Sequence, residues 1–400
     1  MVELSKRLQR LPPYLFAEID KKKSQLKKQG IEFIDVSIGD PDILAPKGVI
    51  KALADAAKIK ANQKYALDQG SLRFRKSIKQ WFNKRFKVSL DVDEEILPLI
   101  GTKEGLVHFP LGIVNPGEYV LIPSPGYPGY RGAASFAGAK VHQMPLLEKN
   151  NFLPDLKKIP ASVRKKAKLM YLNYPNNPTT ALAPVEFLRE LVKFCSKYGI
   201  ILAYDNAYSE IYFDKKPKSI LEIKGAKEIA LEFHSLSKTF CMTGFRIGWA
   251  CGGKDLVKVL LKVKGNIDSG IFTAIQWAAS YALDKENLYV KNLQKALKQR
   301  RDFFVSNLKK SGFKDTYADS TFYVWTKIPA SFKSSMDFSS YLLTEKKIVV
   351  TPGVGFGKYG EGYIRFALTV DINVLKKVFS HKLYPVRDKS LKGLGSLTGF

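Results

Sequence analysis

Between residues 95 and 235 the sequence alternates short apolar runs with longer amphipathic segments. The apolar runs include YVLIPS at 119–124, KLMYLN at 168–173 and ILAYD at 201–205, and the segment at 185–198 has the apolar spacing of a helix. Short apolar strands separated by helices are typical of a parallel, doubly wound sheet with helices on both faces. This alternation therefore predicts an α/β fold whose large domain holds a mostly parallel, doubly wound sheet.

The segments on either side of this region have other patterns. We predict helices over residues 14–29, 46–60 and 71–86, a short strand within 33–42, and one long basic helix over 286–311. After that helix, the strand-like runs TFYVWTKI, KIVVTPG and YIRFALT alternate with helices near 336–346 and 372–381. This mixture predicts a second, smaller α+β domain.

These changes of pattern divide the chain into four parts. The last part has no periodicity, and we expect it to be a loose tail. The predicted parts are an N-terminal arm with part of the small domain at 1–44, a large domain at 45–285, a C-terminal small domain at 286–382 and a basic tail at 383–400.

The overall composition is that of an ordinary globular protein, with 45% hydrophobic and 26% charged residues. The three cysteines are odd in number and lack CxxC spacing, so the sequence supports neither a disulfide framework nor a zinc site. The N-terminus carries charges where a secretory signal needs an apolar run, and nowhere do 18 apolar residues run together. We therefore expect a soluble cytoplasmic protein with no membrane partner.

A net charge of +28 raises nucleic-acid binding as a competing interpretation. The basic residues are spread over separate clusters, at 21–28, 163–168, 256–265 and 298–301. No segment matches a nucleic-acid module, and no aromatic residues are interleaved with these clusters as a stacking platform would require. We expect solvated basic faces and no nucleic-acid partner, and a salt-dependent binding titration would expose one.

The segment FHSLSKTFCMTGFRIGW surrounds Lys238 with small hydroxyl residues, including Ser235 and Ser237, and places Arg246 shortly after it. An amine that forms a Schiff base must be neutral when it attacks, and a fixed cation nearby favours the neutral form. The hydroxyls and the guanidinium can in turn hold a dianionic phosphate. The pattern favours pyridoxal phosphate, which is both an aldehyde and a phosphate. The plainer alternative is a surface lysine on a Ser/Thr turn.

Several polar groups follow predicted strands directly. In open α/β sheets, ligands bind outside the carboxyl ends of the strands. The groups expected at those ends are the turn at 101–104, Tyr127, Asn177, Asp205 and Lys238. The sequence therefore predicts that they surround one site.

The motifs LPLIGTKEG, SPGYPGYR, NYPNNPT, AYDNAYSE, HSLSKT, TGFRIGW and YIRFALT occur in a characteristic order. In that order and spacing the chain resembles the fold-type I, pyridoxal-phosphate-dependent aminotransferases of the aspartate aminotransferase superfamily, from about residue 5 to residue 382. Within this superfamily, RLPPYLFAEID, SIGDPD, FHSLSKT, NIDSGIF and TPGVGFGKYGEGY are most similar to bacterial LL-diaminopimelate aminotransferases.

The resemblance implies cofactor-side roles for individual residues. Lys238 would anchor the cofactor and carry the proton, and Asp205 would keep the pyridine nitrogen protonated. Tyr208 and Asn177 would donate hydrogen bonds to the phenolic oxygen, which lowers the pKa of the internal imine, and Tyr127 would stack on the ring. The residues implied for the phosphate are Thr102, Lys103, Ser235, Ser237 and Arg246.

The resemblance also implies a substrate side and a partner subunit. Arg365, helped by Asn177, would bind the substrate α-carboxylate bidentately. Ile38 and Gly39 would close over the substrate through backbone groups. Tyr65 would cross a dimer interface to the neighbouring subunit's phosphate, which implies a homodimer.

Taken one at a time, these residues have plainer interpretations. Asp205 is compatible with an ordinary acidic strand terminus, and Asn177 with a turn asparagine before proline. Tyr127 is compatible with packing, Lys103 with an exposed helix lysine and Arg365 with a strand-face arginine. The functional interpretation rests on their joint occurrence.

Two positions depart from the family pattern. Thr180 stands where a glycine is usual, and it would be strained if the position requires positive φ. Phe240 stands where many relatives have tyrosine. We expect no metal site and take all four histidines as structural: His108, His142, His234 and His381.

The resemblance implies transamination in two half-reactions between an amino acid and a 2-oxo acid. At the subfamily level the expected substrates are LL-2,6-diaminopimelate and 2-oxoglutarate, interconverted with tetrahydrodipicolinate and glutamate in lysine biosynthesis. An aminotransferase for aspartate, alanine or another amino acid is the nearest alternative, because distal specificity lies in loops and in the partner subunit. A cofactor-binding regulator or inactive homologue is a second alternative.

Overall fold

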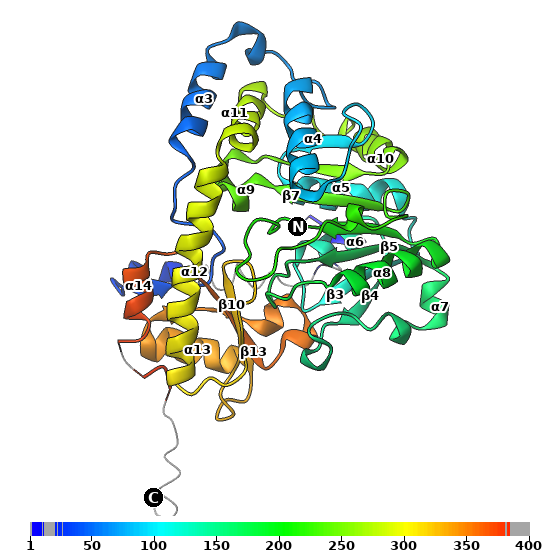
Figure 1. Cartoon of the computed structure of the whole chain (residues 1–400). Helices are drawn as coiled ribbons and strands as arrows, with labels where there is room; N and C mark the ends of the chain where they lie inside the picture. The colour runs from blue at the N-terminus through cyan, green and yellow to red at the C-terminus, as the bar shows by residue number, and fades with distance from the viewer. Residues whose placement is uncertain are drawn as a thin grey trace, which may run out of the picture.

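The computed structural model describes residues 2–9, 11, 21, 23–25, 27–380 and 382–384 of the chain (Figure 1). Its centre is a seven-stranded sheet in the order β2-β8-β7-β6-β5-β3-β4. All neighbouring strands pair in parallel except β8, which is antiparallel to both β2 and β7. The strands are β2 (Ile96–Leu99), β3 (Tyr119–Ser124), β4 (Lys140–Pro145), β5 (Ala167–Asn173), β6 (Ile201–Asp205), β7 (Ala230–Ser235) and β8 (Gly248–Gly252). The predicted α/β class is confirmed.

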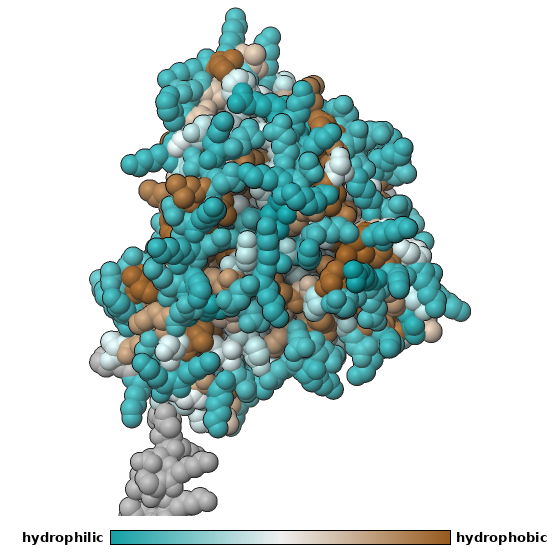
Figure 2. All heavy atoms as spheres, in the orientation of Figure 1, coloured by the Kyte–Doolittle hydropathy of each residue, from teal (hydrophilic) through white to brown (hydrophobic). Residues whose placement is uncertain are grey.

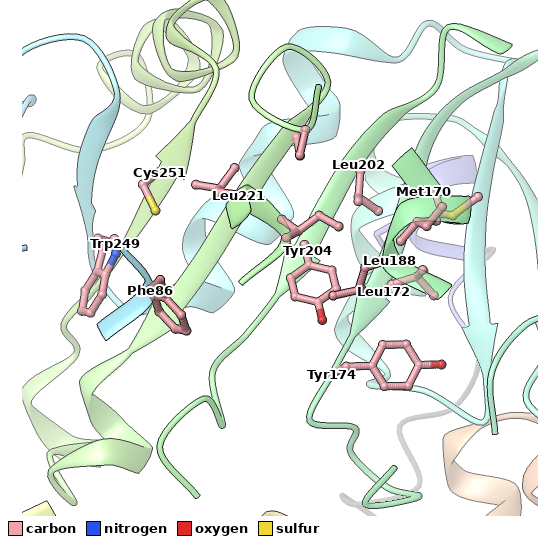
Figure 3. Close-up of a cluster of buried hydrophobic side chains, with 14 of the residues drawn as sticks. Phe86, Met170, Leu172, Tyr174, Leu188, Leu202, Tyr204, Leu221, Trp249 and Cys251 are labelled. Atoms are coloured by element: carbon pink, nitrogen blue, oxygen red, sulfur yellow. The ribbon is translucent and has the colours of Figure 1, made fainter. Parts of the chain in front are cut away.

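Helices cover both faces of this sheet, because successive strand residues point to opposite faces and both sets are apolar. Leu172 and Tyr204 belong to one buried cluster, part of which Figure 3 shows, and the adjacent residues Tyr171 and Ala203 belong to another. The first face is covered by α4 (Leu72–Phe86), α8 (Val185–Tyr198) and α11 (Thr273–Lys285), and the second by α5 (Thr102–Ile113), α6 (Gly129–Phe136) and α10 (Lys254–Lys264).

A second sheet lies beside the long helix α12 (Asn287–Lys310), in the lower part of Figure 1. Its order is β12-β13-β10-β9, and a third buried cluster packs it against α12, α13 and α14. The two-residue strand β1 (Ile34–Asp35) joins this region by pairing in parallel with β11 (Ile348–Val349). The other elements are β9 (Thr316–Tyr317), β10 (Tyr323–Lys327), β12 (Thr351–Pro352), β13 (Tyr363–Ala367), α13 (Ser335–Lys346) and α14 (Ile372–Lys377).

Most predicted elements have a counterpart, but α6, α10, α11 and β8 were not predicted individually. The first two residues of β8 were assigned to the motif TGFRIGW, and the strand includes two glycines. The strand expected within 33–42 is only the two residues of β1, since the chain then turns toward the site at Gly39. The expected helix 14–29 and tail 383–400 lie mostly outside the described residues, and the domain boundaries stay a prediction. The remaining helices are α1 (Lys6–Gln9), α3 (Lys47–Ala57), α7 (Ala161–Arg164) and α9 (Leu236–Thr239).

The face shown in Figure 2 is mostly hydrophilic, with separate hydrophobic areas. Two basic residues nevertheless contradict the expectation of solvated basic clusters. Arg300, in the cluster 298–301, is buried and forms a bidentate ion pair with Asp42, at 2.7 and 3.0 Å. Lys264, in the cluster 256–265, is also fully buried. Among the described helices, none is long and apolar enough to cross a membrane.

Thr180 occupies the position where a glycine is usual, and its φ is +65°. A left-handed backbone costs an L-residue about 1–2 kcal/mol. Part of this cost is offset by hydrogen bonds of a buried loop: Thr180 Oγ1 accepts from the Asp319 N–H at 3.2 Å, and the Thr180 carbonyl accepts from Ser320 Oγ at 2.6 Å. These bonds tie the loop that carries Asn177 to the chain just before β10.

Two substitutions at Thr180 separate the strain from the hydrogen bond. Thr180→Val keeps the strain and leaves the Asp319 N–H without this acceptor, so the free energy of unfolding should fall by about 1–3 kcal/mol. Thr180→Gly relieves the strain as well, so its net effect should stay within about 1 kcal/mol of zero. Urea denaturation of both variants measures this. A valine variant as stable as the parent would show that the hydroxyl contributes nothing, and a valine variant at least as stable as the glycine variant would show that the positive φ costs nothing.

Candidate active site

A cavity of about 310 Å³ lies at the carboxyl ends of the central strands, where the second sheet faces them. Most of the predicted site residues line it: Gly39, Thr102, Lys103, Tyr127, Asn177, Asp205, Tyr208, Ser235, Ser237, Lys238, Arg246 and Arg365. Ile38 and Tyr65 do not line it. The cavity therefore brings together residues that are up to 326 positions apart in the chain, from Gly39 to Arg365.

Lys238 is held on the short helix α9, which follows β7 directly. Ser235 caps this helix, because its Oγ accepts from the Ser237 N–H at 3.2 Å. The Lys238 ammonium donates to the Gly39 carbonyl oxygen at 2.9 Å and lies 5.6 Å from the centre of the Phe322 ring. The amine is thus fixed in the cavity by groups from three distant parts of the chain.

One end of the cavity is built to hold an anion. The N-terminus of the 12-residue helix α5 begins at Thr102, preceded by Gly101 with a φ of +73°. A Cβ on Gly101 would lie 2.6 Å from Arg246 Nη2, so only glycine allows the guanidinium to approach this helix end. Backbone N–H groups, the helix dipole and a guanidinium together favour a phosphate or carboxylate. Ser235 and Ser237 add hydroxyls on the same side.

Arg246 itself has an unusual backbone, with a φ of +54°. Its Nη1 donates to the Thr243 carbonyl oxygen at 2.8 Å. This bond fixes the guanidinium within the turn that precedes β8. The arginine is therefore oriented by its own turn before any ligand binds.

The other end of the cavity contains the buried carboxylate of Asp205. Its Oδ2 accepts from the Tyr130 hydroxyl at 2.7 Å and its Oδ1 from the Ala207 N–H at 3.2 Å. Burial raises the pKa of the Asp205 carboxyl, although Tyr130, the Ala207 N–H, His234 and Lys238 oppose the shift. Among the described residues no lysine or arginine forms an ion pair with Asp205, so a cationic N–H from a ligand would complete its surroundings.

The raised pKa predicts a pH-dependent stability difference. The folded protein holds the Asp205 proton more tightly than the unfolded chain does, so ionisation of this group destabilises the cofactor-free fold as pH rises above 3.8. Asp205→Asn removes the ionisation. The stability of the variant relative to the parent should therefore increase as pH rises from about 4 through the raised pKa, and then level off. Urea denaturation at constant ionic strength measures this, and a difference independent of pH would contradict it.

Arg365 lies on β13 and is buried among oriented acceptors. Its Nη1 donates to Asn177 Oδ1 at 2.8 Å, and its Nη2 donates to the Ser37 carbonyl oxygen at 2.7 Å. Burial lowers the pKa of Arg365, but an arginine stays charged in proteins. Its Nε is buried without a hydrogen-bond partner among the described residues. The site thus presents a charged, planar group suited to a carboxylate.

The cavity and the residues that support its lining include side chains that the sequence did not single out. Asn173, at the end of β5, donates to the Asp205 carbonyl oxygen at 2.8 Å and accepts from the Asn177 N–H at 2.8 Å. Tyr130 orients Asp205, and Tyr323 places its hydroxyl 3.1 Å from that of Tyr208. Asn173 and Tyr130 belong to the recognised motifs NYPNNPT and SPGYPGYR, so those motifs could have revealed them.

Two predicted site residues lie apart from the cavity. Ile38 is half exposed, and its carbonyl oxygen accepts from Thr369 Oγ1 at 2.7 Å. Tyr65 is 94% exposed, in the segment between α3 and α4. Within a single chain, therefore, Tyr65 contributes nothing to the cavity.

One histidine lies in a cluster that its sequence position did not suggest. The ligand atoms of Glu104, His108 and Asp268 lie within 4.8 Å of one another. The buried ammonium of Lys264 contacts both carboxylates, so this group already contains its cation. We therefore interpret it as a buried ion-pair cluster that joins α5 to the end of α10. Phe240 is likewise buried, stacked on Tyr289 at 6.4 Å.

Comparison with known proteins identifies the family. The model for class I and II aminotransferases matches residues 31–381. The chain belongs to this aminotransferase family. The matched span contains the whole cavity, from Gly39 to Arg365.

Relatives of this aminotransferase are similar over nearly their full length. Two proteins named LL-diaminopimelate aminotransferase are each 49% identical to it. The one from Aquifex aeolicus (strain VF5) aligns over 92% of this chain and 96% of its own length, and the one from Maridesulfovibrio salexigens over 94% and 98%. A substrate-bound BacF structure from Bacillus subtilis has a TM-score of 0.92 at 34% identity, covering 94% of this chain and 96% of its own. A Thermus thermophilus aspartate aminotransferase mutant has a TM-score of 0.89 at 27% identity, with coverage of 94% and 98%.

Proposed function

We propose that this aminotransferase uses pyridoxal phosphate to transfer an amino group from LL-2,6-diaminopimelate to 2-oxoglutarate, giving tetrahydrodipicolinate and glutamate in lysine biosynthesis. The observation that carries the proposal is the convergence of Lys238, Asp205 and Arg365 in one cavity. The choice of substrate is supported by relatives that bear the diaminopimelate name at 49% identity. We further propose that the enzyme works in the cytoplasm.

The residues of the cavity fit pyridoxal phosphate at both ends. The helix end at Thr102 and the guanidinium of Arg246 suit a phosphate dianion, and Gly101 leaves the space between them that a Cβ would fill. Asp205, buried and without a cationic partner among the described residues, suits a protonated ring nitrogen. Lys238 suits the aldehyde. We propose that Thr102, Lys103, Ser235, Ser237 and Arg246 hold the phosphate and that Tyr127 packs on the ring.

When bound, pyridoxal phosphate supplies an electron sink that makes the α-proton of an amino acid acidic. The chain's own residues then determine which proton moves and to where. The Lys238 amine takes the proton from the substrate α-carbon, since it is the basic group that projects into the cavity from α9. Asp205 stabilises positive charge at the ring nitrogen, and Tyr208 and Asn177 donate hydrogen bonds to the phenolic oxygen.

Arg365 would orient the substrate by its α-carboxylate. The Asn177 and Ser37 oxygens fix the plane of the guanidinium, so the carboxylate is received in one orientation. This orientation decides which bond at the α-carbon faces the Lys238 amine. Gly39, whose carbonyl oxygen accepts from Lys238, would close the same side of the cavity through its backbone.

We also propose a homodimer in which Tyr65 reaches the phosphate site of the partner subunit. In the single chain Tyr65 is 94% exposed. Leu67, two residues further along the chain, is also an exposed apolar side chain, and so are Ile267 and Phe272 in a second segment. A Cβ on Gly270 would lie 2.8 Å from the Leu67 carbonyl oxygen, so the two exposed segments touch. Light scattering of the purified protein tests the dimer, and a monomer at micromolar concentration would contradict it.

Steady-state rates test the substrate. With 2-oxoglutarate as acceptor, LL-diaminopimelate should give a higher kcat/KM than aspartate or alanine. No detectable turnover of diaminopimelate, with turnover of aspartate or alanine, would replace this proposal by another amino-acid specificity. No turnover of any donor by a protein that binds the cofactor would favour a cofactor-binding regulator instead.

A further inference from the structure

Tyr323 begins β10 and is buried in the cavity, where it contacts two of the proposed site residues. Its hydroxyl lies 3.1 Å from the Tyr208 hydroxyl. The centre of its ring lies 4.0 Å from the guanidinium carbon of Arg365. The sequence pattern assigned this residue only to an apolar strand. Its position lets it touch both Tyr208, a proposed cofactor contact, and Arg365, the proposed carboxylate contact.

The donor in the hydrogen bond between Tyr323 and Tyr208 is determined once the Tyr208 hydroxyl donates its proton to another group. Each hydroxyl carries one proton, so if Tyr208 donates to the cofactor's phenolic oxygen, Tyr323 must be the donor to Tyr208. A hydroxyl that accepts a hydrogen bond becomes a stronger donor itself. Burial, followed by Tyr323, holds the pKa of Tyr208 well above its usual value, so Tyr208 keeps its proton as a donor. The Tyr323 hydroxyl therefore acts on the cofactor only through Tyr208.

The ring contact fixes Arg365 from the side that its hydrogen bonds leave open. The guanidinium contacts two aromatic rings, Tyr323 at 4.0 Å and Phe356 at 4.7 Å. Cation–π contact of this kind stabilises the charged group without using its N–H donors. Those donors remain directed at Asn177, at Ser37 and at the cavity.

The fit around Tyr323 is close on a third side. A Cβ added to Gly39 would lie 1.9 Å from the Tyr323 hydroxyl oxygen, so the Gly39 backbone packs directly on it. Gly39 also receives the Lys238 hydrogen bond. Tyr323 is therefore confined to a single position, which a residue that orients its neighbours requires.

We propose that Tyr323 is a positioning residue with two separable effects: its hydroxyl strengthens Tyr208 as a donor, and its ring holds Arg365 for the substrate carboxylate. The inference rests on the proposed function, because it assigns Tyr208 to the cofactor and Arg365 to the substrate. It adds a residue that acts on both through direct contact.

Tyr323→Phe and Tyr323→Leu separate the two effects. Phenylalanine keeps the ring and removes the hydroxyl, which weakens the hydrogen bond that Tyr208 donates to the phenolic oxygen. The pH midpoint of the visible absorbance band of the loaded enzyme should therefore rise by about 0.3 to 1 unit, with KM for the amino donor within about twofold of the parent. Leucine removes the ring as well, so KM should also rise, by about 2- to 30-fold.

Tyr174→Phe is the matched control, because Tyr174 is a buried tyrosine outside the cavity whose hydroxyl donates to the Phe152 carbonyl oxygen at 2.8 Å. It should leave the band midpoint and KM unchanged. A band present in Tyr323→Phe with an unchanged midpoint would overturn the hydroxyl effect, and equal KM values in the Phe and Leu variants would overturn the ring effect. A parent protein that shows no visible band would instead contradict the proposed function. Circular dichroism checks that the leucine variant is folded, and the phenylalanine variant tests the inference in either case.

Discussion

Replacing Lys238 with alanine should lower kcat for transamination by at least about 10⁴-fold. The substitution removes the amine that lies in the cavity on α9, together with its hydrogen bond to the Gly39 carbonyl oxygen. It removes the proposed anchor and the proposed proton carrier at the same time. We expect the protein to stay folded, because Lys238 is only partly buried and what its removal loses is a hydrogen bond to a backbone carbonyl oxygen.

The control for Lys238 is Lys258→Ala. Lys258 lies on α10, outside the cavity, and its ion pair with Glu94 is exposed, so its loss should change neither kcat nor stability measurably. Single-turnover rates of both variants, with far-UV circular dichroism, make the comparison. A Lys238→Ala protein that retains a tenth or more of the parent's kcat would exclude this lysine as the proton carrier.

Replacing Arg365 with lysine should lower kcat/KM by about 30- to 5000-fold, mostly through KM. Lysine keeps the positive charge but lacks the planar guanidinium. The guanidinium donates hydrogen bonds to Asn177 and Ser37 and at the same time faces the substrate. The Asn177 oxygen, which is buried, would lose its charged donor. The carboxylate would then be held by a single, mobile point charge.

Arg189→Lys, on the exposed side of α8, is the matched control and should leave kcat/KM unchanged. Donor-dependent initial rates separate KM from kcat in both variants. A fall in kcat with an unchanged KM would mean that Arg365 acts on the reacting atoms and not on substrate binding. An unchanged kcat/KM would remove Arg365 from the site.

The fold could be predicted to the extent that local pattern determines it. The parallel strands are apolar on both faces, so their type and the mostly parallel character of the sheet followed from the sequence, whereas their order in the sheet did not. Strand β8 could not be predicted in this way, because its pairing with β2 and β7 depends on neighbours that are distant in sequence. Arg300 and Lys264 were wrongly assigned to solvated faces, since each is buried beside a carboxylate from a distant segment, Asp42 for Arg300 and Glu104 for Lys264.

The site could be predicted where a motif carries a side chain with an unusual chemical requirement. Lys238, Asp205 and Arg365 stand in such motifs, and the structure places them in one cavity. Tyr323 could not be found from the sequence, because an aromatic residue at the start of an apolar strand is usually packing. Its contacts depend on how β10 meets Tyr208 and β13. At Thr180 the sequence predicted strain only if the backbone has a positive φ, and the structure has a positive φ there.

A spectral titration of the purified protein tests whether Lys238 binds pyridoxal phosphate and transfers an amino group. We expect a visible absorbance band from bound pyridoxal phosphate that changes on addition of LL-diaminopimelate, returns on addition of 2-oxoglutarate with formation of one glutamate per site, and is lost in Lys238→Ala. A protein without such a band, or one whose band persists in Lys238→Ala and does not respond to any amino donor, would contradict it.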